Sequence, residues 1–93
     1  MVKIEKYFFY VLLCSNGAFY AGTTNNLNHR IKTHNLGKGA KYTRSHLPVT
    51  LIYYEIFPDK GSALSFEIKF KKLNRFQKEK YLQKHCNCFK KSV

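Results

Sequence analysis

Apolar and polar positions fall along the chain in blocks that predict three strands. Rings and branched side chains fill both alternating faces of residues 7–14, which predicts a strand covered on both sides. A turn over residues 15–17 and a partner strand over residues 18–23 follow, so these two strands form a hairpin. Residues 49–57 are rich in β-branched and aromatic side chains and predict the third strand.

Three helices and one irregular segment complete the pattern. Two asparagines at 25–26 supply polar caps for a helix over residues 27–34. Further helices are predicted over residues 62–73 and 75–84, whereas residues 35–48 carry no periodic pattern and are expected to form a mobile basic loop. The chain has 93 residues, enough for one small domain. The predicted fold class is therefore α/β, with helices packed on a small mixed or antiparallel sheet.

The register of the hairpin decides whether Tyr10 and Tyr20 meet. A three-residue loop over 15–17, with its glycine in the left-handed conformation, places Tyr10 opposite Gly22 and on the same face as Tyr20. A two-residue loop over 16–17 would place the two tyrosines on opposite faces of the sheet. In the simplest alternative, each tyrosine only fills the core.

The charge balance narrows the range of partners. Lys and Arg number 17 against 5 Asp and Glu, which gives a net charge of +12. Such a surplus makes a polyanion the expected partner. The longest apolar run, residues 7–14, is far below the about 20 residues that span a bilayer, so no membrane is expected. Three cysteines without an export signal indicate reduced thiols and a cytoplasmic protein.

Glu67 is the polar residue that most needs an explanation. It falls inside a wide apolar arc of the helix over residues 62–73, and burying a carboxylate without partners is costly. Lys71, four residues on, could form an exposed ion pair with it. A hard divalent cation would explain it equally well, because Mg²⁺ binds carboxylate oxygen and keeps several waters. Both explanations stay open at this point.

Arg30 and His34 lie one turn apart beside the apolar stripe of the helix over residues 27–34. His29 points to the opposite, solvated side. The simple explanation of Arg30 is a surface charge whose stem packs on apolar neighbours. For His34 it is a residue favoured by the dipole at the end of a helix.

In order and spacing, these residues resemble the GIY-YIG nuclease superfamily, and in particular its small stand-alone bacterial branch. The resemblance covers about residues 6–81. It rests on Tyr10, Tyr20-Ala21-Gly22, Arg30, His34 and Glu67, and on a loop over residues 35–44 that is similar to the signature loop of that branch.

The resemblance implies a three-stranded antiparallel sheet flanked by helices over residues 1–84, followed by a basic, frayed tail over 85–93. It implies an endonuclease that hydrolyses phosphodiester bonds, with DNA the favoured substrate and repair or recombination the expected process. One divalent ion, Mg²⁺ or Mn²⁺, would assist the reaction. The catalytic positions of the family are matched here by Tyr10, Tyr20, Arg30, His34 and Glu67, of which Glu67 matches the metal ligand.

Basic residues of the irregular segment and of the last two helices would hold the flanking phosphates. These residues are Lys38, Lys41, Arg44, Lys71, Lys72 and Arg75. Larger relatives carry a separate DNA-binding domain, so a protein partner that supplies specificity is a further expectation here.

Some features depart from the family pattern. The first motif, Phe8-Phe9-Tyr10, lacks its glycine, and Ala21 replaces the usual aliphatic residue of the second motif. Many relatives carry an asparagine near the end of the domain, but Asn74 lies too close to Glu67 to count as that residue.

A non-catalytic nucleic-acid-binding module of the same fold would explain the charge but not Glu67, and a small RNA or ribosome binder is a third hypothesis. Residues 85–88 contain metal-ligand types without a second pair at zinc-finger spacing, so no zinc site is expected.

Overall fold

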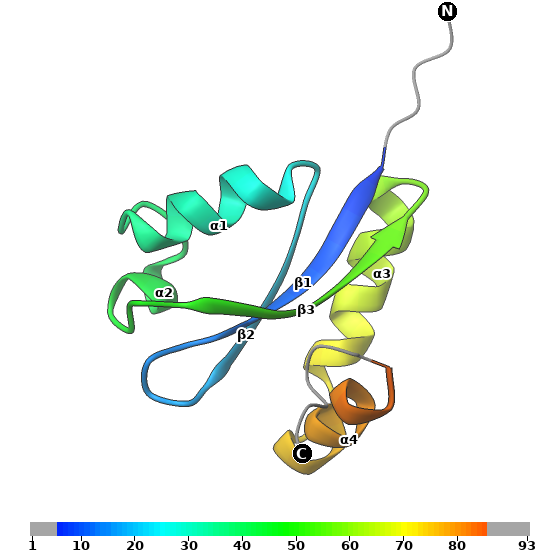
Figure 1. The fold of residues 1–93 in the computed structure, drawn as a ribbon. Helices are drawn as coiled ribbons and strands as arrows, with labels where there is room; N and C mark the ends of the chain where they lie inside the picture. The colour runs from blue at the N-terminus through cyan, green and yellow to red at the C-terminus, as the bar shows by residue number, and fades with distance from the viewer. Residues whose placement is uncertain (1–5, 86–93) are drawn as a thin grey trace, which may run out of the picture.

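The computed structural model describes residues 6–85, which form three strands and four helices (Figure 1). Along the chain the elements are β1 (Tyr7–Leu13), β2 (Phe19–Thr24), α1 (Leu27–Asn35), α2 (Lys41–Arg44), β3 (Thr50–Phe57), α3 (Lys60–Lys71) and α4 (Arg75–His85). The predicted α/β class is confirmed, and so are all three strands, each within one residue. None of the helices in this range is long and apolar enough to cross a membrane.

β1 is the central strand of an antiparallel sheet with the order β2-β1-β3. Tyr10 pairs with Gly22, and Leu12 pairs with Tyr20. The three-residue loop is therefore confirmed, and Tyr10 and Tyr20 share a face because side chains alternate along a strand. Gly17 permits this turn, since its φ of +87° lies in the left-handed region that other residues rarely adopt.

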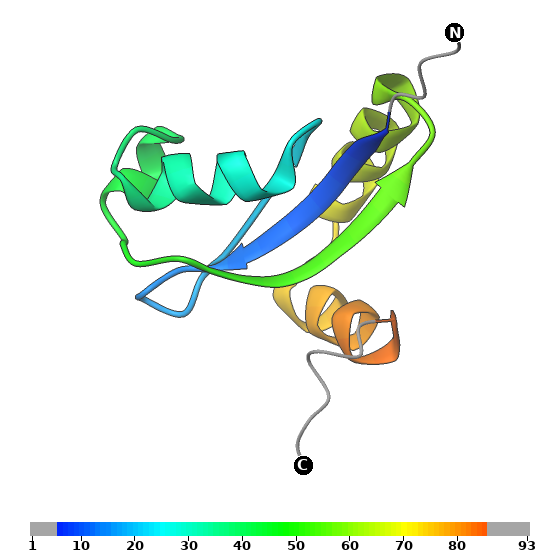
Figure 2. The same cartoon turned by 45° about the horizontal axis from the view of Figure 1, so that its top comes forward.

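Both faces of β1 are buried, as the sequence predicts. On one face Phe9 joins a core cluster with Phe70 of α3 and Leu82 of α4. On the other face Tyr10 belongs to a second cluster, against which Ile31 of α1 packs. Figure 2 shows α1 and α4 on opposite sides of the sheet. The face that carries both tyrosines is thus the face covered by α1.

Residues 35–48 differ from the predicted irregular loop. Lys41–Arg44 form the short helix α2, in which Thr43 is fully buried. The Asn35 side chain joins the two ends of this segment. Its Nδ2 donates to Val49 O over 3.1 Å, and its Oδ1 accepts from Val49 N over 2.8 Å. A helix of four residues is too short to produce a recognisable hydrophobic period, so the pattern could not reveal it.

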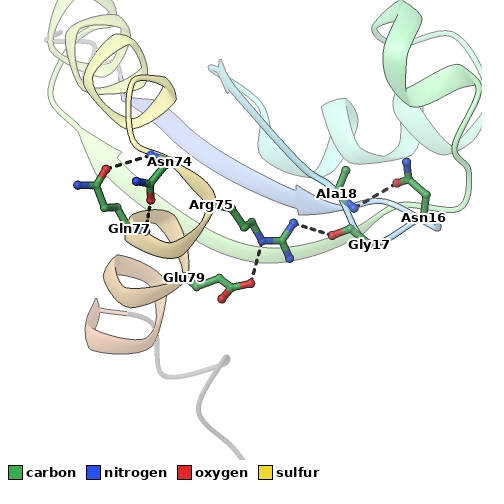
Figure 3. A network of polar contacts seen from close by, with 7 residues as sticks. All are labelled: Asn16, Gly17, Ala18, Asn74, Arg75, Gln77 and Glu79. Atoms are coloured by element: carbon green, nitrogen blue, oxygen red, sulfur yellow. Dashed lines mark hydrogen bonds and ion pairs between the residues drawn. The ribbon is translucent and has the colours of Figure 1, made fainter.

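Two helices in the second half begin at side-chain caps. The Asp59 carboxylate accepts a hydrogen bond from Ser62 N over 2.7 Å, so α3 begins two residues earlier than predicted. The helix also ends two residues earlier, at Lys71. Asn74 and Gln77 form a reciprocal cap before α4: each side-chain oxygen accepts from the backbone N–H of the other residue (Figure 3). This cap explains Asn74 without a role in a site.

The boundary of the predicted tail is one residue too early. His85 is the last residue of α4, and its ring stacks on Tyr81 with 4.1 Å between ring centroids. The rest of the predicted tail, with Cys86 and Cys88, lies outside the described residues.

Arg75 docks α4 against the β1–β2 hairpin (Figure 3). Its Nη1 donates to Gly17 O over 2.9 Å, and its Nε donates to Glu79 over 2.8 Å. The guanidinium carbon also lies 3.8 Å from the centroid of the Phe19 ring. Arg75 was predicted to contact phosphates, but in the structure its guanidinium joins two segments of the protein.

We expect Arg75→Ala to lower the free energy of unfolding by about 1–2 kcal/mol, because it removes two hydrogen bonds and a cation–π contact. Urea denaturation followed by circular dichroism measures this loss. Lys72→Ala is the matched control at an exposed basic position and should change stability by less than about 0.5 kcal/mol. An Arg75→Ala protein as stable as the wild type would rule out the docking role.

Candidate active site

The Tyr10 hydroxyl lies at the centre of a polar cluster between β1 and α1. It is hydrogen-bonded to His34 Nε2 over 3.1 Å and accepts a hydrogen bond from Arg30 Nε over 3.4 Å. Arg30 and His34 reach the same hydroxyl because they lie one turn apart on α1. Their predicted position on one side of the helix is therefore confirmed, and His29 is exposed as expected.

His34 is fully buried. Its Nδ1 lies 2.8 Å from Thr43 Oγ1, and that hydroxyl donates to Ala40 O over 2.9 Å. Burial lowers the pKa of His34 below its usual value, and the positive charge of Arg30 lowers it further. His34 is consequently a neutral imidazole at neutral pH, with one N–H group and one acceptor nitrogen.

Two glycines make room for this cluster. A Cβ atom at Gly22 would lie 2.6 Å from the Tyr10 hydroxyl oxygen, closer than real Cβ atoms approach. A Cβ atom at Gly39 would overlap His34 Nδ1. Neither glycine has a positive φ, so what each position requires is space rather than an unusual backbone conformation.

Tyr20 and Glu67 complete the cluster from β2 and α3. The Tyr20 ring packs edge-on against the His34 ring, with 5.4 Å between ring centroids. Burial raises the pKa of Tyr10, Arg30 opposes that effect, and the nearby Tyr20 and Glu67 raise the pKa further. Tyr10, Tyr20, Arg30 and His34 are thus joined by direct contacts, and Glu67 is near enough for its charge to act on Tyr10.

Glu67 forms an ion pair with Lys71, with 2.6 Å between the carboxylate and Nζ. The Lys71 ammonium also lies 5.9 Å from the centroid of the Tyr20 ring. The ion pair expected from the sequence is thus present. It leaves the second explanation of Glu67 open, because the Lys71 side chain is half exposed and a divalent cation would compete for the same carboxylate.

A divalent ion could bind beside the polar cluster only through the single carboxylate of Glu67, with water and substrate phosphate as its other ligands. Within residues 6–85, no three His, Cys, Asp or Glu side chains form a group that could hold a metal. Mg²⁺ does not need such a group, since it commonly binds through one or two carboxylates, substrate phosphates and water. Glu67 would be its protein ligand, and Mn²⁺, which accepts the same oxygen donors, would fit equally.

All six predicted phosphate-binding residues are exposed, and they differ in whether the protein already binds their charged groups. Exposed side chains without a structural partner described above are Lys38, Lys41, Arg44 and Lys72. Lys71 pairs with Glu67, and Arg75 holds the hairpin. The first four are therefore available to an anionic partner, three of them on the segment that leads into and forms α2.

The sequence of this cluster matches a known catalytic domain. A family model described as the GIY-YIG catalytic domain matches residues 6–82. This chain belongs to the GIY-YIG family. Every residue of the polar cluster lies inside the matched range.

Bacterial proteins described as UPF0213 proteins are similar to most of this chain. A UPF0213 protein of Bacillus cereus is 58% identical over 86% of this chain and 83% of its own. A UPF0213 protein of Lacticaseibacillus paracasei is 53% identical over 87% and 91%. The solution structure of a UPF0213 protein of Bacillus halodurans is similar, with a TM-score of 0.60, 38% identity and coverage of 88% and 87%. A protein of E. faecalis gives a TM-score of 0.61, 45% identity and coverage of 90% of both chains.

Sequence reasoning missed the contact of Thr43 with His34 and the need for a residue without a side chain at positions 22 and 39. Thr43 lies in the segment that showed no pattern, and its contact with His34 depends on how that segment folds back. The sequence held one usable signal, the glycine at 39, which follows Lys38 and lies five residues after His34. A glycine that close to a GIY-YIG histidine indicates a tight approach of the backbone to a side chain.

We expect Gly39→Ala to destabilise the protein by about 1–3 kcal/mol, because the added methyl group forces His34 out of its position. Gly61→Ala is the matched control: it lies in α3, and its Cβ atom would meet no atom closer than 3.5 Å. That change should be neutral or stabilise by about 0.4–1 kcal/mol. Urea titrations of the three proteins compare these effects. Equal stability of the two variants would show that space beside His34 is not limiting.

Proposed function

We propose that this protein is a metal-dependent endonuclease that hydrolyses phosphodiester bonds in DNA in the cytoplasm. The observation that carries the proposal is the convergence of two tyrosines, an arginine, a histidine and a carboxylate beside exposed basic residues. Membership of the GIY-YIG family supports a nuclease. The net charge of +12 supports a polyanionic substrate.

The chemistry requires an activated water and relief of negative charge on the phosphate. A Mg²⁺ or Mn²⁺ ion bound at Glu67 would supply positive charge beside the leaving oxygen. Arg30 uses Nε on Tyr10, which leaves the other N–H groups of its planar guanidinium for the non-bridging oxygens. Water attacks phosphorus, the bond to the leaving oxygen breaks, and one product keeps the phosphate.

The two tyrosines have different parts in this proposal. Tyr10 is 1% exposed and its hydroxyl is already bonded to His34 and Arg30, so its part is to hold the Arg30 guanidinium in place. Tyr20 is more exposed and lies on the same face, so its hydroxyl can lose its own proton to solvent. As a phenolate it is the better-placed acceptor for a proton of the attacking water.

The first test of the proposal is Glu67→Gln, which keeps the size of the side chain but removes the charge that a cation needs. Cleavage of labelled DNA with Mg²⁺ or Mn²⁺ should fall by at least about a hundredfold, because metal stabilisation of the transition state contributes several kcal/mol. Binding without metal should persist or tighten slightly. Single-turnover cleavage and fluorescence anisotropy measure the two effects.

Glu79→Gln is the matched control for this test. Glu79 is also the acid of an i,i+4 ion pair, but it lies on α4 and pairs with Arg75. Its replacement should leave cleavage unchanged. A folded Glu67→Gln protein that cuts at the wild-type rate would overturn the site assignment. A wild-type protein that binds single-stranded, duplex, flapped and branched DNA without cutting any of them would favour the non-catalytic binding module.

The salt dependence of binding tests which basic residues contact phosphate. We expect affinity to fall steeply with salt, and Lys41→Ala to lower the slope of log K against log[salt] by about 0.7–0.9. Arg75→Ala should leave the slope unchanged, since its guanidinium is held by Gly17 and Glu79. Anisotropy titrations at several salt concentrations give these slopes. An equal loss of slope in both variants would show that Arg75 also contacts the nucleic acid.

A further inference from the structure

Thr43 is the buried residue that connects α2 to the polar cluster. It is fully buried, as is His34, and its hydroxyl lies 2.8 Å from His34 Nδ1. The same hydroxyl donates to the Ala40 carbonyl over 2.9 Å. A threonine hydroxyl has a single hydrogen, so once that hydrogen points to Ala40 O, the oxygen can only accept a hydrogen bond from His34.

The direction of this bond determines the next ones. If His34 Nδ1 donates to Thr43, the neutral ring carries its hydrogen on Nδ1 and leaves Nε2 as an acceptor. The Tyr10 hydroxyl then donates to Nε2 over 3.1 Å. The Tyr10 oxygen keeps its lone pairs for Arg30 Nε, which donates over 3.4 Å. The hydrogen bonds thus form one series that runs through Arg30, Tyr10, His34, Thr43 and Ala40. In this series each group donates a hydrogen bond to the next one.

The opposite tautomer of His34 would break this order. Nε2 would then carry the hydrogen and donate to the Tyr10 oxygen, which already accepts from Arg30. The Tyr10 hydrogen would then face the N–H groups of Arg30 and His34 instead of an acceptor. The Thr43 hydroxyl would have to turn from Ala40 O to the unprotonated Nδ1, which leaves Ala40 O with the Arg44 N–H alone. Because Tyr10, His34 and Thr43 are buried, water cannot replace a hydrogen bond that this tautomer leaves unmade.

We infer that Thr43 is a positioning residue of the site: it fixes the Nδ1–H tautomer of His34 and so orients the Tyr10 hydroxyl that holds Arg30. The tautomer follows, for a neutral His34 ring, from the hydrogen bond that Thr43 donates to Ala40 O. The effect on cleavage rests on the proposed nuclease function. Thr43 itself touches neither substrate nor metal, since His34 and Tyr10 lie between it and Arg30.

Nitrogen NMR of the metal-free, ¹⁵N-labelled protein tests the tautomer directly, because protonated and unprotonated imidazole nitrogens differ widely in chemical shift. The wild type should show His34 with Nδ1 protonated and Nε2 unprotonated at pH 7.5. Thr43→Ser keeps the hydroxyl and should keep this pattern. Thr43→Val removes it and should yield mixed tautomers or a protonated Nε2. Thr33→Val, which removes a hydroxyl bonded to His29 O on the same helix, is the control and should change nothing at His34.

Cleavage is the second readout. Thr43→Val should slow single-turnover cleavage by about ten- to a hundredfold through misplacement of Arg30, and Thr43→Ser should restore most of the rate. A wild-type His34 protonated on Nε2 would overturn the inference even if Thr43→Val does not fold. An unchanged tautomer in a folded Thr43→Val protein would overturn it as well. A wild type that cuts no DNA but shows the predicted tautomers would refute the nuclease proposal and leave the tautomer assignment intact.

Discussion

The hydrogen bond between the Tyr10 hydroxyl and His34 Nε2 is the interaction on which the rest of the site depends. Both residues are buried, so the bond joins the central strand to α1 inside the protein rather than at its surface. It requires space, which Gly22 and Gly39 provide by having no side chain. It also sets where α1 lies on the sheet, and with it the position of Arg30.

Much of this arrangement could be predicted because it follows from local rules. The glycine in the hairpin loop indicates the register, and the register places Tyr10 and Tyr20 on one face. The helical period places Arg30 and His34 on one side of α1. The contacts of Thr43 and Arg75 could not be predicted in this way. The hydrogen bond from Arg75 to Gly17 joins residues 58 positions apart, and no local pattern encodes it.

Glu67 illustrates how one explanation from sequence can be confirmed while a second stays a proposal. Its ion pair with Lys71 is present, and it accounts for a partly buried carboxylate in the absence of a metal. The same ion pair keeps a positive charge beside Tyr20. A substrate phosphate beside Lys71 would attract the ammonium away from Glu67 and release the carboxylate for a cation. In this account Lys71 balances the charge of the free site and contacts phosphate in the bound one.

The central claim is that Tyr10 acts through Arg30 rather than on the substrate. A double-mutant cycle on the single-turnover cleavage rate, with Tyr10→Phe and Arg30→Ala alone and combined, tests it most directly. We predict that Tyr10→Phe slows cleavage in the wild-type background but has no further effect once Arg30 is gone. If the two losses multiply instead, Tyr10 acts on the substrate independently of Arg30, and the account is contradicted.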